Sequence, residues 1–190
     1  MRAPYLYPKN KINEFVRAKE KWIVKHITKA KKSPRKRRDQ IFVGGEYFQL
    51  VNKLSKFKKI EISGRQFIIS ATNKKLANDI IGKYLLDLTK QKISYLTAKY
   101  QNEFNLENYR IIYKFYKSKW GSCSAKNVLS FNALISMAPD EIIEYILIHE
   151  LVHLKIKNHG RVFWREVEKY DLEYKTHHKW LAQNRDMLKT

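Results

Sequence analysis

The stretch ILIHELVHLKIKNHG, residues 146–160, holds three of the chain's six histidines and governs how the rest of the sequence is interpreted. The run that leads into it is apolar on nearly every side, which predicts a helix buried in the fold. On such a helix His149 and His153, four residues apart, lie one turn apart on the same face. These imidazoles and the carboxyl of Glu150 are costly to bury without partners, and a metal ion would be one.

The same residues form the pattern H-E-x-x-H, which is typical of zinc peptidases. Its spacing lets two imidazoles reach one ion at about 2.0–2.1 Å, while Glu150 lies off the ligand face, close to a metal-bound water. Asn158 and Gly160 predict the end of the helix, because both tolerate the left-handed backbone that ends helices. His159 lies at that exit and is the predicted third ligand. The fourth position is then open to a water, whose proton Glu150 would take as general base.

Other residues could complete such a site. The metzincin peptidases share the ligand spacing, but Ile156 replaces their glycine and no Met-turn sequence is obvious, so that family is not supported. Peptide deformylases combine H-E-x-x-H with an upstream cysteine, which here would be Cys123. Other zinc peptidases use a downstream acid, and the candidates here are Glu166, Glu168, Asp171 and Glu173. We favour His159, because Cys123 falls in a predicted link between strands and the acids fall in or near a charged helix.

The 190-residue chain is strongly basic, with a formal net charge of +21. Residues 1–39 hold 14 Lys and Arg against 3 Asp and Glu, an excess of +11. This charge makes DNA, RNA or another polyanion a candidate partner of the N-terminal region, although a solvated lysine-rich surface is equally compatible. No run of 18 uncharged apolar residues and no signal-peptide core is present, so no membrane segment is predicted. With a single cysteine, we expect a cytoplasmic location.

Hydrophobic periodicity predicts both helices and strands. The predicted helices span residues 10–31, 74–104, a segment from about 139 that carries the histidines, 161–171 and 176–188. The predicted strands span residues 39–51 and 58–71, with turns at Gly44-Gly45 and Ser63-Gly64, and residues 109–120 and 128–137. The short polar link 121–127 predicts that the last two strands form an antiparallel hairpin. Residues 31–38 are expected to be a linker, and an aromatic and aliphatic stripe of the long helix, Tyr95 included, is expected to face the core.

These elements predict an α+β fold in one compact domain over residues 1–190. Its first part, 1–110, would contain the basic N-terminal helix, strands and the long helix. Its second part, 111–190, would contain the strand hairpin, the H-E-x-x-H helix and the C-terminal helices. A small antiparallel or mixed sheet would pack on the buried metal-binding helix.

Five short motifs follow one another between residues 115 and 165: W-G-S-C-S (120–124), F-N (131–132), H-E-L-V-H-L (149–154), N-H (158–159) and F-W (163–164). In this order they resemble the YgjP-like metallopeptidase domain family. The resemblance implies a compact zincin-like fold, zinc bound by His149, His153 and His159, and Glu150 as the catalytic acid and base. It also implies that the strand after Trp120 lies beside the metal helix, where its edge could hold an extended peptide.

The chain departs from that family at two points. Lys119 stands where members usually have an arginine, and the usual first β-hairpin is missing from the N-terminal region. Neither departure touches the predicted metal site.

The leading functional hypothesis is therefore a zinc-dependent metallopeptidase with one zinc ion per chain and a protein or peptide substrate. The alternative is a metal-dependent nuclease, or a nucleic-acid-binding protein, that uses the same three histidines. Glu150 favours peptide hydrolysis, because one ribosomal-RNA-processing family with this histidine spacing has glycine at that position. The sequence leaves the oligomeric state open.

Overall fold

The computed structural model describes residues 8–20 and 39–185. The chain divides into two units, Met1–Arg35 and Lys36–Thr190, and each is described by itself. No helix within the described ranges is both long and apolar enough to cross a membrane.

The first unit contains helix α1, Lys9–Ala18, which begins one residue before the helix predicted over residues 10–31 and covers its first part. The rest of that predicted helix and the linker predicted at 31–38 lie outside the described residues. The expectation of a single domain over residues 1–190 therefore stays a prediction.

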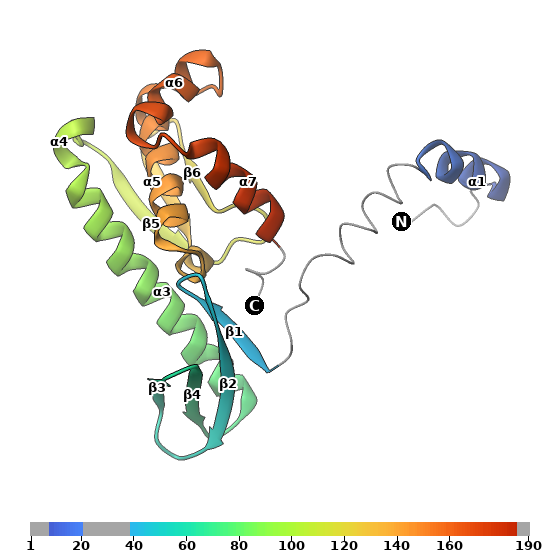
Figure 1. Ribbon diagram of the computed structural model, residues 1–190, viewed down its shortest axis with the longest axis vertical. Coiled ribbons are helices and arrows are strands. Elements are labelled where there is room, and N and C mark those ends of the chain that lie inside the picture. The colour runs from blue at the N-terminus through green and yellow to red at the C-terminus, as the bar shows by residue number, and fades with distance from the viewer. Residues whose placement is uncertain (1–7, 21–38, 186–190) are drawn as a thin grey trace. The chain divides into compact units, whose positions relative to one another are not determined.

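Four strands of the second unit form a mixed sheet (Figure 1). They are β1 Gln40–Val43, β2 Glu46–Leu54, β3 Lys59–Ser63 and β4 Gln66–Ala71. Their order is β1-β2-β4-β3, with β2 parallel to β4 and the two outer pairs antiparallel. Both predicted glycine turns are confirmed, since Gly44, Gly45 and Gly64 all have positive φ, which glycine tolerates best. A Cβ on Gly45 would lie 2.9 Å from Cγ of Pro139, so the first turn packs closely against a later part of the chain.

The long helix predicted over residues 74–104 is present as α3, Lys74–Lys99, followed by a short turn, α4, Gln101–Phe104. Asn73 caps α3, because its Oδ1 accepts a hydrogen bond from the backbone N–H of Leu76 at 2.9 Å. Ile93 lies on the buried face of α3, and Tyr95 is two residues, or about 200°, further round the helix. The prediction that Tyr95 faces the core is therefore wrong, and its side chain is 73% exposed.

A second sheet has three strands: β5 Arg110–Lys114, β6 Gly121–Cys123 and β7 Val128–Asn132. In the order β5-β7-β6, β5 is parallel to β7 and β6 is antiparallel to it. The predicted antiparallel hairpin is thus wrong, because β5, from the predicted first strand, pairs with β7 in parallel, and the antiparallel partner β6 comes from the predicted link 121–127. Residues 133–137 form a 3₁₀ helix, η1, Ala133–Met137, where the sequence predicted more strand.

Asn132 explains both the position of β6 and the change from strand to 3₁₀ helix after β7. It is 3% exposed, and its Nδ2 donates hydrogen bonds to the carbonyl oxygens of Tyr116 and Lys119, each at 2.9 Å. Its Oδ1 accepts from the N–H of Leu134 at 3.1 Å, which ends the strand and starts η1. Its own N–H donates to the carbonyl of Trp120 at 2.8 Å. The buried side-chain amide of Asn132 therefore fixes residues 116–120, the segment that leads into β6.

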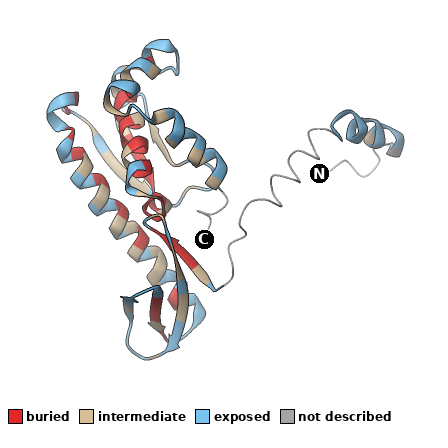
Figure 2. Cartoon of the chain, in the orientation of Figure 1, coloured by how far each residue is buried: buried red, intermediate tan, exposed pale blue. Residues whose placement is uncertain are grey.

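Three helices complete the unit: α5 Asp140–Lys155, α6 Arg161–Tyr170 and α7 Tyr174–Asn184. They match the three helices predicted from residue 139 onward. Helix α5 is buried along most of its length (Figure 2) and contacts β6, α3, α6 and α7. Glu144 fixes it beside the end of α3 by accepting hydrogen bonds from Nζ of Lys99 and the hydroxyl of Tyr100, each at 2.7 Å. The predicted α+β fold, with a small mixed sheet packed on a buried helix, is confirmed.

The end of α5 differs from the prediction. The residue after the helix, Ile156, has an extended backbone, and neither Asn158 nor Gly160 is left-handed. Gly160 instead precedes the first turn of α6. The chain leaves α5 by straightening, and residues 156–160 return it toward the histidines of the helix.

Candidate metal centre

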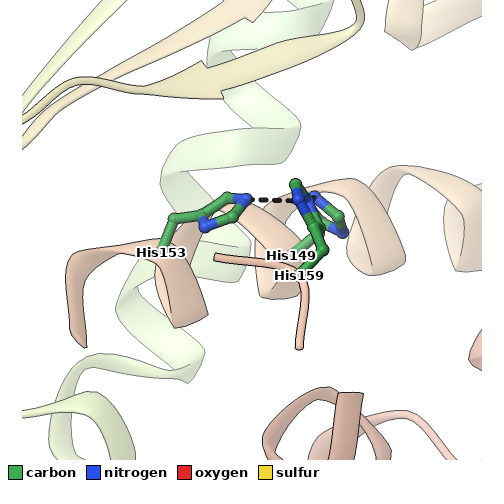
Figure 3. Close-up of side chains that lie close together, drawn as sticks. All are labelled: His149, His153 and His159. Carbon is green, nitrogen blue, oxygen red and sulfur yellow. Dashed lines mark hydrogen bonds between the residues drawn. The ribbon is translucent and has the colours of Figure 1, made fainter. Parts of the chain in front are cut away.

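Three imidazoles converge at one end of α5 (Figure 3). Nε2 of His159 lies 3.0 Å from Nε2 of His149 and 3.1 Å from Nε2 of His153. Two nitrogens that bind one tetrahedral zinc at about 2.0–2.1 Å lie about 3.3 Å apart, close to these separations. His149 and His153 come from successive turns of α5, and His159 comes from the returning segment. The three predicted ligands are thus brought together.

The ring of His153 is held in one orientation. Its Nδ1 lies 2.9 Å from the carbonyl oxygen of Ile156 and donates to it, so Nε2 keeps its lone pair. The extended backbone at Ile156 is what brings that carbonyl within reach. The way α5 ends therefore also orients a candidate ligand.

The close approach of these three imidazole nitrogens is unfavourable in the protein without a bound cation. Burial, together with the nearby His153, His159 and His178, lowers the pKa of His149 to about 3. Burial likewise lowers the pKa of His153. Protonation is thus disfavoured, and lone pairs that face one another repel. A divalent cation that binds neutral imidazoles fits this donor set.

Two aromatic side chains of α6 support the imidazoles. Phe163 is fully buried, and its ring centroid lies 4.9, 4.5 and 4.7 Å from those of His149, His153 and His159, respectively. Trp164 lies beside His149 and His159, with centroids 5.9 and 5.7 Å away. The F-W motif therefore forms the apolar wall against which the candidate ligands pack.

Glu150 lies beside the cluster, on the neighbouring side of α5. It is 5% exposed, and burial raises the pKa of its carboxyl to about 8, with Lys119 opposing that shift. Among the described residues, neither Oε2 of Glu150 nor Nδ1 of His149 has a hydrogen-bond partner. A buried carboxylate oxygen without a partner is costly unless a water, substrate or ion completes it.

The backbone of β6 crosses directly against Glu150. A Cβ added to Gly121 would lie 2.6 Å from Oε1 and 2.8 Å from Cγ of Glu150. Any other residue at position 121 would displace this carboxyl. The reason for the glycine is thus the close approach of strand to carboxylate.

A cavity of about 200 Å³ opens next to these groups. Its lining residues are Trp120, Gly121, Tyr145, Ile146, His149, Glu150, His178 and Leu181. The hydroxyl of Tyr145 lies 3.0 Å from Nδ1 of His178. Burial raises the pKa of Tyr145 well above its ordinary value, so the hydroxyl keeps its proton. It donates to Nδ1 in the His178 tautomer that carries its N–H on Nε2, and it accepts from Nδ1 in the other tautomer.

The other candidate ligands lie elsewhere. Within the described ranges, the cluster of three potential metal ligands contains neither Cys123 nor Glu166, Glu168, Asp171 and Glu173. Cys123 belongs to β6, and Nζ of Lys157 lies 3.7 Å from its Sγ. Asp171 accepts a hydrogen bond from Nδ1 of His177 at 2.7 Å.

Sequence reasoning missed three residues of the cavity. Tyr145 carried a signal, since it lies four residues before His149 and so on the same face of α5. Gly121 was noted only as part of a motif, and its role depends on which strand crosses Glu150. His178 had no local signal, because α7 brings it to the cavity from 25 or more residues away.

One family model and two solved structures are similar to this chain. The family model described as "YgjP-like, metallopeptidase domain" matches residues 1–184. A crystal structure of the metallopeptidase zymogen jannalysin of Methanocaldococcus jannaschii is 30% identical, covers 49% of this chain and 96% of its own, and has a TM-score of 0.44. The zymogen of Pyrococcus abyssi abylysin is 26% identical, covers 55% and 95%, and has a TM-score of 0.37. No curated protein matches the sequence. Since the model spans nearly the whole chain, the protein belongs to the YgjP-like metallopeptidase family.

Proposed function

We propose that the protein is a zinc-dependent peptidase in which His149, His153 and His159 hold the ion and Glu150 is the catalytic acid and base. The observation that carries this proposal is the position of Glu150. Its carboxyl is buried beside three converging imidazole nitrogens, and one oxygen has no partner among the described residues. Tetrahedral N₃ coordination with an open position is a pattern that zinc peptidases use.

Zinc, when bound, would acidify a water and polarise the scissile carbonyl. Glu150 would take a proton from the attacking water and deliver it to the leaving amine. In the metal-free protein burial raises the pKa of this carboxyl, so its surroundings favour the protonated form that returns the proton. His153 contributes by keeping its Nε2 lone pair available through the bond to Ile156.

The substrate would be an extended peptide beside β6. In the three-stranded sheet β6 pairs with β7 on one side, and no described strand pairs with its other edge. That edge can bind a peptide main chain through backbone hydrogen bonds. Because Gly121 lies against Glu150, a peptide on this edge would pass the catalytic carboxyl.

His178 of α7 lines the same cavity and would assist there. In the tautomer whose Nδ1 accepts from Tyr145, its Nε2–H would be available to a carbonyl oxygen that gains negative charge. We expect His178→Ala to lower kcat by about 100-fold while KM for a casein substrate and zinc content stay near wild type. His177→Ala is the matched control, since His177 bonds to Asp171 instead. Equal losses in the two variants would contradict this role.

The nuclease alternative gains no support, because the matched family and both similar structures are peptidases. A polyanion contact through the N-terminal region and a cytoplasmic location stay predictions. The first depends mainly on residues 21–38, which lie outside the described residues. A gel-shift experiment at low salt in which the full chain fails to shift DNA would contradict it.

Glu150→Gln tests the proposed mechanism. Because the amide cannot take up a proton, we expect casein hydrolysis to fall at least 100- to 10,000-fold while about one zinc per chain remains, measured by plasma mass spectrometry. Glu141→Gln, an exposed acid on the same helix, is the control. His159→Ala should instead lose most of the zinc. A Glu150→Gln variant with full activity would refute the assignment.

A further inference from the structure

A second surface stands out at the far end of the fold, at the β2–β3 loop, a name that here includes the strand ends on either side and covers residues 52–59. These residues read NKLSKFKK, with four lysines and no acidic residue. Leu54 is 88% exposed and Phe57 is 83% exposed, among the most exposed large apolar side chains described. Two exposed apolar side chains among lysines are unusual on a surface that contacts only water, because the exposed Leu54 and Phe57 do not stabilise the fold there.

The loop has a defined shape. The N–H of Ser55 donates to the carbonyl of Ala71 at 3.1 Å, which joins the loop to the end of β4. Oγ of Ser55 then accepts a hydrogen bond from the N–H of Phe57 at 3.0 Å. Ser55 therefore holds Phe57 in a turn that presents its ring to solvent.

A hollow of about 360 Å³ lies next to this turn. Ile69, Ala71 and Ala77 give it an apolar floor, and Leu54 is one wall. Its polar rim contains two asparagines and two lysines: Asn52, Lys53, Asn73 and Lys74. The hollow thus offers a concave apolar surface, and the groups at its edge bind anions and hydrogen-bonding partners.

The lysines of the loop are largely uncompensated. Lys59 pairs with Glu61 at 3.1 Å. No carboxylate in the described part of the chain forms an ion pair with Lys53, Lys56 or Lys58. The surface therefore carries concentrated positive charge around exposed apolar groups.

We propose that this surface binds single-stranded nucleic acid. Single-stranded DNA and RNA are bound by aromatic side chains that stack on bases beside lysines that contact the phosphates. Phe57 would provide the stacking ring, the lysines of the loop the phosphate contacts, and the hollow a place for a neighbouring base. The side-chain amide of Asn52 on its rim would match the hydrogen-bonding edge of a base, whereas Oδ1 of Asn73 caps α3.

This surface is separate from the metal centre. It lies at the first turn of α3, whereas α5 is fixed beside the last turn through Glu144 and Lys99 (Figure 1). From Lys74 to Lys99 there are 25 residues, or about 38 Å at 1.5 Å each. A nucleic acid bound here would leave the cavity beside Glu150 open, so binding and hydrolysis can occur together.

An anionic lipid surface would also attract the lysines. Insertion into a bilayer, however, favours apolar side chains that project from the protein surface without polar neighbours. Here Leu54 is a wall of a hollow whose rim carries two asparagine side chains. The concave, amide-edged shape suits a base better than a lipid surface.

The first test measures fluorescence anisotropy of labelled oligothymidylate with the full chain carrying Glu150→Gln, so that proteolysis plays no part. Adding Phe57→Ala should weaken binding by about 5- to 150-fold, the range for loss of one stacked base. Tyr95→Ala, which removes another exposed aromatic on a lysine-rich surface, should leave it unchanged. Lys56→Gln with Lys58→Gln should flatten the plot of log affinity against log salt by about 1.4, for two lost phosphate contacts.

The second test locates the contact. An oligonucleotide with 5-iododeoxyuridine, irradiated on the protein, should crosslink to the peptide that contains Phe57, as mapped by mass spectrometry. Crosslinks confined to residues 1–39, or a Phe57→Ala variant that binds like wild type, would overturn the proposal. So would a Phe57→Ala variant that loses binding only to phosphatidylserine vesicles. Each outcome is independent of whether the protein hydrolyses peptides.

Discussion

The metal centre and the β2–β3 loop use polar and apolar residues in opposite ways. At the metal centre, histidines and a carboxyl are buried against Phe163 and the apolar body of α5. At the loop, apolar side chains are exposed among lysines. Both arrangements cost free energy in the isolated protein, since buried polar groups lose water and exposed apolar groups order it. The comparison teaches that a binding site can be recognised either by buried polar side chains or by exposed apolar side chains.

The largest expected contrast concerns two phenylalanines. Phe163 is fully buried under three imidazoles, so Phe163→Ala should lower the free energy of unfolding by about 3–5 kcal/mol and weaken zinc binding. Phe57→Ala, the matched change at the loop, should alter stability by less than about 0.5 kcal/mol. Urea unfolding of both variants measures this. Similar losses would show that the loop belongs to the folded core.

Gly121→Ala tests how closely strand and carboxyl are fitted. The new Cβ would meet Oε1 of Glu150 at 2.6 Å, so the carboxyl must shift. A displacement of this size should reduce casein hydrolysis by about 100-fold, with the zinc content retained. Gly82→Ala is the control, because its Cβ would meet only the ring of Phe115 at an ordinary 3.6 Å. Full activity in Gly121→Ala would show that Glu150 need not occupy its observed position.

The metal-free protein should lose stability as the pH rises from about 6.5 to 8. In the folded protein Glu150 keeps its proton up to a pKa of about 8, whereas unfolded it loses that proton near 4.5. Between these two pKa values the folded protein keeps a proton that the unfolded chain has released. The stabilising contribution of protonated Glu150 therefore falls as the pH rises from about 6.5 to 8. A pKa difference of one is worth about 1.4 kcal/mol, and relaxation of the site limits the total to a few kcal/mol.

His149 has the opposite sign but acts at lower pH. Its folded pKa is about 3 against an ordinary 6.5, so its destabilising effect appears only as the pH falls below 6.5. The decline above 6.5 should thus disappear in Glu150→Gln. Thermal unfolding of metal-stripped wild type and variant across this range is the measurement. A decline of equal slope in both would assign it to another group.

The sequence predicted the clustering of the three histidines, because their signals are local. His149, Glu150 and His153 follow from the period of one helix, and His159 from a short return segment. The cavity could not be predicted in the same way, since Gly121 and His178 reach it from β6 and α7. β6 itself was missed, because three residues in a polar link have no periodicity to detect. Its pairing with β7 depends on Asn132, which holds the segment that leads into β6 through bonds that span 13 and 16 residues.

The three histidines of the candidate metal centre are attached to the fold in two different ways. His149 and His153 belong to α5, which is buried along most of its length, whereas His159 and its neighbours Asn158 and Gly160 are exposed. No residue of the segment 156–160 is buried, whereas ten residues of α5 are. In the proposed site, a local opening of this segment would release one ligand, at the cost of the contacts of His159 with Phe163 and of Ile156 with His153, while α5 would keep the other two. The rate at which a metal ion enters or leaves would then be set by a five-residue segment and not by the global stability of the protein.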